Sequence, residues 1–440
     1  MNKINKYLDY VKNRTTVKAV ISNIAWLSFD KILRLSIGAV VGILATRYLG
    51  PERYGTLAYA GSIASLSGAF IGLGLDQIIV RDLSISNKKE NELLGTSFIL
   101  KLSGGVIAYV LSILALFILQ SDSTIFTLVS IIGLSLIFRA FDVLQFYFQS
   151  QIKAKFLVIS RNIAFSITTV LKLFFILFKM NVFFFGLLIS LELFIAGLFF
   201  IYFYSIQGKS ILRWNFNFST SRILLVESWP LILGSIAATI YFNIDQIFIA
   251  NLLNNKQVGY YAAALRLSEI WYFIPSAIHI SLLPTLTKIA NENKEIFYKR
   301  FAQVCAYTFS FALVFALTIS LSANKLILLI YGKDFSSAGS ILAIHAWTLV
   351  VIFIGIMASL YTMIFHLQKI SLIYNIVIAI LNILLDWYLI PHFNAVGAAY
   401  ATLIAYTIGN YLILFFLPST KDIAILITKT IINPFIFYKV

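Results

Sequence analysis

The sequence predicts an all-α integral membrane protein, with about twelve transmembrane helices in two six-helix lobes around a central cavity. Three observations support this fold class. Of the 440 residues, 60% are hydrophobic and 12% are charged, whereas a soluble domain is about half apolar and about a quarter charged. Apolar runs long enough to cross a bilayer recur along the whole chain, and one short turn sequence recurs in its two halves.

The apolar runs define the expected helices. A transmembrane helix needs about 20 mostly apolar residues, because it must satisfy its own backbone hydrogen bonds across about 30 Å of hydrocarbon. Polar segments such as "LGPERYG", "LNNKQVG" and "YGKDFSS" separate the runs. The predicted spans are residues 22–48, 54–80, 96–119, 125–149, 160–178, 182–206, 223–250, 258–285, 297–321, 337–365, 372–390 and 395–417.

The basic residues orient these helices. The formal net charge of +16 would suggest nucleic acid in a soluble protein, but here the Lys and Arg residues mostly lie between apolar runs. The loops on the side of the N-terminus hold 22 of them and the opposite loops hold 6. By the positive-inside rule both termini are therefore predicted to be cytoplasmic, with basic segments near anionic membrane lipid. No nucleic-acid partner is expected.

Several function classes are not expected. The first twenty residues are polar and basic, so no cleavable signal is predicted. All loops are short and no phosphate-binding glycine loop occurs, so the chain houses no nucleotide-binding domain. Cys305 is the single cysteine, and no two of the four histidines stand at metal-ligand spacing. We expect no cofactor and no metal site.

A repeat relates the two halves. "LGPERYGTLAYA" aligns without a gap with "LNNKQVGYYAAA", at a constant offset of 204 residues that places Gly55 on Gly259. Both turns follow an apolar run on the predicted outer side, which indicates a parallel duplication. The predicted organisation is a cytoplasmic segment 1–18, a six-helix lobe 19–208, a cytoplasmic linker 209–222, a second six-helix lobe 223–417 and a cytoplasmic tail 418–440.

These segments carry a family resemblance. "LATRYLGPERYGTLAYAGSI" and "IDQIFIANLLNNKQVGYYAAALRLSEI" resemble the two repeat signatures of the polysaccharide transporter family, the Wzx-type flippases, in the superfamily of MATE and MurJ transporters. The resemblance implies a transporter, not an enzyme, that moves undecaprenyl-diphosphate-linked oligosaccharide across the bacterial inner membrane for O-antigen or capsule synthesis. It also implies a polysaccharide polymerase and a chain-length regulator as partners.

Charges within the spans are candidates for substrate binding, because ionised groups in hydrocarbon are costly and usually functional. Arginine binds phosphate oxygens with two parallel hydrogen bonds, so an anionic diphosphate favours it over lysine. The alternative for Arg34 is a local ion pair with Asp30, four residues before it on the same helical face. The substrate-binding candidates are Arg34, Arg139, Arg266, Lys172 and Asp30.

Other charged residues in or near the spans suggest two further roles, ion coupling and gating. Asp245 lies within the seventh predicted span and could couple transport to H⁺ or Na⁺, or simply form a structural contact. Asp76 and Arg81 end the second span, and Glu269 stands three residues after Arg266; these are gate candidates. Asp386 and Glu192 are weaker ion-coupling candidates.

Other functions remain open. A small-molecule exporter of the MATE kind would favour an acidic cavity, whereas six basic residues lie within the spans. A membrane-embedded glycan polymerase or glycosyltransferase usually needs a large outer loop or a catalytic acidic motif, and no loop here is long enough. A non-catalytic scaffold for polysaccharide assembly is the remaining alternative.

Overall fold

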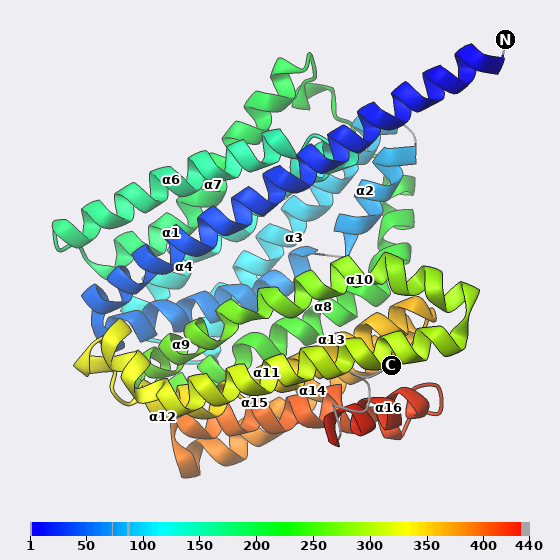
Figure 1. Cartoon of the computed structure of the whole chain (residues 1–440). Helices are drawn as coiled ribbons and strands as arrows, with labels where there is room; N and C mark the ends of the chain where they lie inside the picture. The colour runs from blue at the N-terminus through cyan, green and yellow to red at the C-terminus, as the bar shows by residue number, and fades with distance from the viewer. Residues whose placement is uncertain (1, 73, 86–88, 433–440) are drawn as a thin grey trace. The chain divides into compact units, whose positions relative to one another are not determined.

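A computed structural model describes residues 2–72, 74–85 and 89–432. Within these ranges the chain is helical and contains no strand, so the predicted all-α class is confirmed (Figure 1). The predicted tail 418–440 lies partly outside the described residues. The α-helices are α1 (Asn2–Gly72), α2 (Leu75–Ile85), α3 (Glu90–Ile118), α4 (Ser123–Phe138), α5 (Asp142–Ser150), α6 (Ala154–Leu177), α7 (Val182–Ile206), α8 (Phe218–Leu252), α9 (Asn255–Glu269), α10 (Phe273–Glu292), α11 (Lys294–Ile330), α12 (Ala338–His345), α13 (Thr348–Ile364), α14 (Gln368–Phe393), α15 (Ala395–Asn410) and α16 (Lys421–Ile432).

Eleven helical segments among the described residues are long and apolar enough to cross a membrane. One of them, Leu33–Ala69, overlaps both of the first two predicted spans, 22–48 and 54–80. The two helices join at a kink in α1, where Gly50 has a φ of 69° and Pro51 begins the next helix. Glycine tolerates that left-handed backbone, and proline suits a first helical turn because it has no N–H to leave unpaired. The prediction of about twelve spans is therefore confirmed.

The helices form two compact units. Unit 1 comprises Met1–Tyr48 and Ser67–Ile232, and unit 2 comprises Leu49–Leu66 and Leu233–Val440. The helix that follows the kink therefore groups with the second half of the chain up to Leu66. The lobe boundaries predicted from the sequence remain a prediction.

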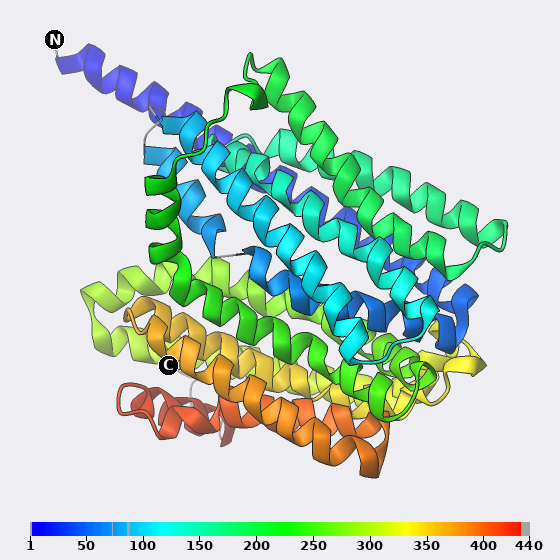
Figure 2. The ribbon, with the colours of Figure 1, turned by 180° about the vertical axis from the view of Figure 1, so that it is seen from behind.

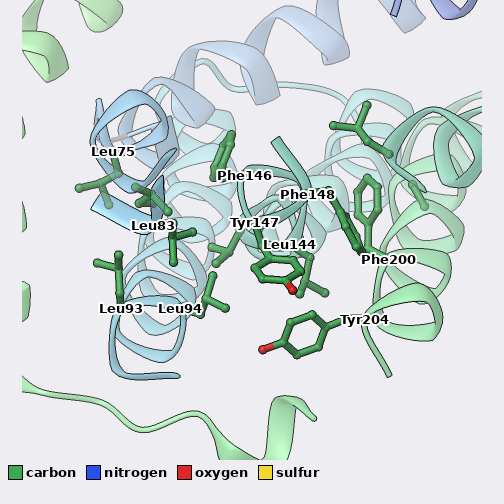
Figure 3. Close-up of a cluster of buried hydrophobic side chains, with 14 of the residues drawn as sticks. Leu75, Leu83, Leu93, Leu94, Leu144, Phe146, Tyr147, Phe148, Phe200 and Tyr204 are labelled. Atoms are coloured by element: carbon green, nitrogen blue, oxygen red, sulfur yellow. The ribbon is translucent and has the colours of Figure 1, made fainter. Parts of the chain in front are cut away.

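The core of unit 1 is rich in aromatic side chains (Figure 3). Tyr147 and Phe148 of α5 pack against Phe200 and Tyr204 of α7, and the rings of Tyr147 and Tyr204 meet edge to face at 5.1 Å. Leucines of α2 and α3 complete the cluster. Large rings of this kind bury much apolar surface and fix the helices that they touch, so the cluster gives α5 and α7 a defined relative position.

Unit 2 brings the two repeated turns together. A Cβ atom built on Gly55 would overlap the carbonyl oxygen of Asn255, and one built on Gly259 would overlap the carbonyl oxygen of Pro51. The 204-residue offset also maps Pro51 onto Asn255, so the same contact is made in both directions. Backbone lies in the place of each missing side chain, and glycine is therefore required at both positions. Further along unit 2, α14 and α15 pack side by side (Figure 2).

Candidate functional site

Arg34 joins α1, α6 and α7 of unit 1; Figure 1 shows the ribbons of these three helices. Its Nε donates to Asp30 Oδ1 of the same helix at 3.0 Å, and its Nη1 donates to Glu192 Oε1 of α7 at 3.0 Å. Its Nη2 donates to the backbone carbonyl oxygen of Arg161 in α6 at 2.5 Å. A charge inside a membrane span needs such partners, because hydrocarbon cannot replace its hydration. The predicted Asp30–Arg34 pair is present, and it is one part of a larger network.

A pocket of about 230 Å³ lies beside this network. It is formed by α1, α6, α7 and the junction between α4 and α5. Its lining combines charged side chains with aromatic rings, so it offers polar contacts beside apolar surface. The side chains that line it include Arg34, Asp142, Arg161, Glu192, Phe138, Phe141 and Phe200.

Arg161 falls at the edge of the predicted span 160–178 and was not among the substrate-binding candidates, but it lies two turns into α6 and lines this pocket. No hydrogen bond or ion pair of its guanidinium occurs within the described residues, although Asp142, Asp30 and Glu192 attract it from a longer distance. The sequence signal for the position of Arg161 in a helix is weak. The segment "YFQSQIKAKFLVIS" before it has no strong helix breaker, so the first residue of α6 could not be located from the sequence.

The other predicted basic residues of unit 1 are distributed differently. Arg139 stands in a single 3₁₀ turn between α4 and α5, and its Nε is 3.9 Å from Asp142 Oδ2. Lys172 lies eleven residues after Arg161 in the same helix, which is about 16 Å along the helix axis. Lys101 is 3% exposed and donates to Asp76 Oδ1 at 2.7 Å. The structure thus brings Arg139 near the pocket and places Lys172 further along α6, away from the pocket residue Arg161.

The gate candidate Arg81 of α2 binds two carboxylates of unit 1. Its guanidinium donates to both carboxylate oxygens of Glu227 in α8, at 2.5 and 3.0 Å, and to Asp82 Oδ1 at 2.8 Å. The hydrogen bonds from Arg81 lower the pKa of Glu227 below its usual value, and the hydrogen bonds to Glu227 and Asp82 raise the pKa of Arg81. This bidentate ion pair between Arg81 and Glu227 links α2 to the first half of α8.

Asp245 of α8 lies in a buried polar cluster in unit 2. Its Oδ2 accepts hydrogen bonds from the hydroxyl groups of Tyr261 and Thr402, the second at 2.8 Å. Asn382 and Asp386 of α14 lie near it, but none of their side-chain atoms has a hydrogen-bond partner among the described residues. Asp386 is fully buried, and neither of its carboxylate oxygens has a hydrogen-bond partner among the residues that the structure describes. Two carboxyl groups, an amide and hydroxyls are the groups that hold a proton or a hard cation.

Arg266 and Glu269 lie at the end of α9, also in unit 2. Arg266 is exposed, and within the described part of the chain the two side chains do not form an ion pair, although Arg266 attracts the Glu269 carboxylate. The structure therefore does not bring Arg266 into either cluster described above. Its predicted role in substrate binding and the gate role of Glu269 remain predictions.

The fold defines the class: a multi-pass membrane protein with charged clusters within its spans. Residues 20–290 match the model of the family described as "Polysaccharide biosynthesis protein". Because this match covers more than half of the chain, the protein belongs to that family. The resemblance stated from the sequence is confirmed at the level of family and fold.

Known proteins support this assignment. The "Probable flippase AglR" of Haloferax volcanii is 28% identical over 184 residues, which are 40% of this chain and 38% of that protein, so the match spans about two fifths of the relative. An inward-facing multidrug resistance MATE family transporter superposes with a TM-score of 0.72 at 16% identity, over 93% of this chain and 99% of the other. The lipid II flippase MurJ, in an inward closed conformation, superposes with a TM-score of 0.67 at 16% identity, over 95% and 92%. These two structures establish the fold alone.

Proposed function

We propose that the protein is a flippase that moves an undecaprenyl-diphosphate-linked oligosaccharide from the inner to the outer leaflet of a bacterial cytoplasmic membrane by alternating access. Membership of the polysaccharide biosynthesis family supports the glycan, and the name of the matched relative supports the flippase activity. The observation that carries the proposal is the pocket of unit 1, where Arg34, Arg161 and three aromatic rings line one cavity inside the membrane spans.

The chemistry of the substrate explains why such a site is needed. A diphosphate and a glycan lose their hydration in hydrocarbon, at a cost far above thermal energy. Arginine side chains replace water around phosphate oxygens, and aromatic rings exclude bulk water and strengthen the attraction. Three further basic residues are proposed to stabilise the anion along its path. They are Arg139 beside Asp142, and Arg266 and Lys172 elsewhere in the spans.

The Asp245 cluster is proposed to couple this movement to an H⁺ or Na⁺ gradient. Two ionised carboxylates near one another repel strongly in a low dielectric, so Asp245 and Asp386 together favour a bound proton or cation. The hydroxyl groups of Tyr261 and Thr402 and the amide of Asn382 complete a set of oxygen ligands suited to such an ion. Filling and emptying of the cluster would then favour different conformations of α8, α14 and α15.

In the cell, both termini are proposed to face the cytoplasm, with Asp76, Arg81 and Glu269 near the gates. The delivered repeat unit would be used for O-antigen or capsular polysaccharide, so a polysaccharide polymerase and a chain-length regulator are the proposed partners. This part of the proposal rests on the family and on the bias of basic residues between the loops.

Transport by the purified protein tests the proposal. A fluorescent polyprenyl-diphosphate oligosaccharide is placed in both leaflets of proteoliposomes, and a membrane-impermeant quencher reports how fast the inner pool becomes accessible. We expect faster exchange than in protein-free vesicles, and faster exchange again under an inward H⁺ or Na⁺ gradient. Exchange equal to that of protein-free vesicles, together with gradient-driven efflux of a cationic dye, would instead indicate a drug exporter.

A further inference from the structure

We propose that the guanidinium of Arg161 is the group in the unit 1 pocket that binds a phosphate-type oxyanion, and that Arg34 is a positioning residue that acts through Arg161. This inference rests on the proposed function for the identity of the anion, a lipid-linked diphosphate. The head group of an anionic phospholipid carries the same kind of phosphate oxyanion. The experiment below distinguishes these two ligands.

Arg34 is already paired with two carboxylates and a backbone carbonyl group. All three of its guanidinium nitrogens donate hydrogen bonds, to Asp30, to Glu192 and to the carbonyl oxygen of Arg161. Two carboxylates at 3.0 Å neutralise its charge. An incoming phosphate would therefore meet a cation that two carboxylates already neutralise, and those carboxylates would repel it.

Arg161 is in the opposite situation. Its side chain lines the pocket, and within the described residues its guanidinium makes neither a hydrogen bond nor an ion pair. Its five N–H donors are therefore available to a ligand in the pocket. A partly desolvated cation without such contacts is unfavourable, and an oxyanion that supplies them is correspondingly favoured.

The pocket has the size and surroundings for that group. Its volume of about 230 Å³ is large enough for a phosphate or diphosphate group. The rings of Phe138, Phe141 and Phe200 line the remaining wall, so the anion would sit in a poorly hydrated space where a charge-assisted hydrogen bond is strong.

The contact of Arg34 with Arg161 explains the positioning role. The Nη2 of Arg34 holds the carbonyl oxygen of Arg161 at 2.5 Å, while its Nη1 is anchored on Glu192 of α7. These bonds fix the backbone of α6 at Arg161 relative to α1 and α7. The Arg161 side chain is thereby held against the pocket, since the Cα from which it extends cannot move away.

Anion binding to the intact protein in detergent tests the inference, with thermal stability as the readout. Binding to the folded state alone raises the unfolding temperature with ligand concentration. Inorganic pyrophosphate represents the diphosphate, and phosphatidylglycerol compared with phosphatidylcholine represents the head group. For Arg161→Gln we expect at least a tenfold loss of pyrophosphate affinity, because a hydrogen bond to a charged group is worth about 1.5–3 kcal/mol. Lys155→Gln, an exposed charge in the same helix, is the matched control and should bind as the wild type does.

The double variant separates the two roles. If Arg34 acts only through Arg161, then Arg34→Gln combined with Arg161→Gln loses no more affinity than Arg161→Gln alone. Additive losses would show that Arg34 contacts the anion itself and would overturn its positioning role. Stabilisation of the wild type by phosphatidylglycerol alone, lost in Arg161→Gln, would support the site and identify its ligand as a lipid head group.

A measurement on the wild-type protein covers the case of a variant that fails to fold. Phenylglyoxal modifies accessible arginines, and peptide mass analysis locates the modified side chains. Pyrophosphate should slow modification of Arg161 at least tenfold and leave that of Arg213, an exposed residue outside the pocket, unchanged. Unslowed modification, or wild-type affinity in Arg161→Gln, would overturn the inference. Loss of anion binding with intact flipping would refute this site alone, whereas intact binding without flipping would refute the proposed function.

Discussion

The reciprocal contact of the two repeated turns predicts that Gly259→Ala destabilises unit 2. The new Cβ would overlap the carbonyl oxygen of Pro51 and come within 2.7 Å of its carbonyl carbon. These atoms belong to backbone at the beginning of a helix, so they cannot rotate away as a flexible side chain could. Overpacking of this kind costs about 1–3 kcal/mol. In a unit of about 200 residues, each kcal/mol lowers the unfolding temperature by about 2–4 °C, so we expect a decrease of about 5 °C.

Gly61→Ala is the matched control for this substitution. Gly61 lies in the same unit, inside α1, and a Cβ built there meets no atom within 4 Å. Alanine in a helix interior is favoured over glycine by about 0.5–1 kcal/mol, so this variant should unfold at the wild-type temperature or slightly above it. Thermal unfolding of both variants in the same detergent is the assay. Equal unfolding temperatures for Gly259→Ala and Gly61→Ala would refute the reasoning from the close contact.

Three further predictions concern charged pairs. Asp76→Asn should lower the unfolding temperature more than Lys101→Met, because it leaves a buried ammonium unpaired, whereas the carboxylate left by the second change is 52% exposed; thermal unfolding compares them. Arg81 lowers the pKa of Glu227, so the stability from this pair is present above the usual glutamate pKa of about 4.3 and is lost as the pH falls through the lowered value; Glu227→Gln should remove this pH dependence from unfolding curves, and an unchanged curve would contradict it. Asp245→Asn should abolish the response of transport to an H⁺ or Na⁺ gradient, and a retained response would exclude Asp245 from ion coupling.

Much of the fold could be predicted from the sequence, because membrane spans depend on one local property. A run of about 20 apolar residues is sufficient to identify a span, and the repeated turn with Gly55 and Gly259 was recognisable at a fixed offset. The continuous path of α1 could not be predicted. Whether Gly50 and Pro51 end a helix or only bend it depends on how the following segment packs, and Leu49–Leu66 packs within unit 2.

The site was only partly predictable. The Asp30–Arg34 pair follows from four-residue spacing on one helix and is present. Glu192 was a weaker ion-coupling candidate in the sequence, whereas the structure pairs it with Arg34. The meeting of Asp245 with Asp386 joins residues 141 positions apart. Such contacts depend on how helices pack against one another, which hydropathy along a single chain does not specify.

The central claim is that the protein moves a lipid-linked, anionic glycan between leaflets. The most direct test is leaflet exchange of a fluorescent polyprenyl-diphosphate oligosaccharide in proteoliposomes that contain the purified wild-type protein or the Arg161→Gln variant. The account predicts protein-dependent exchange with the wild type and at least a tenfold slower rate with the variant, at equal amounts of inserted protein. Exchange no faster than in protein-free vesicles would contradict the proposed transport activity.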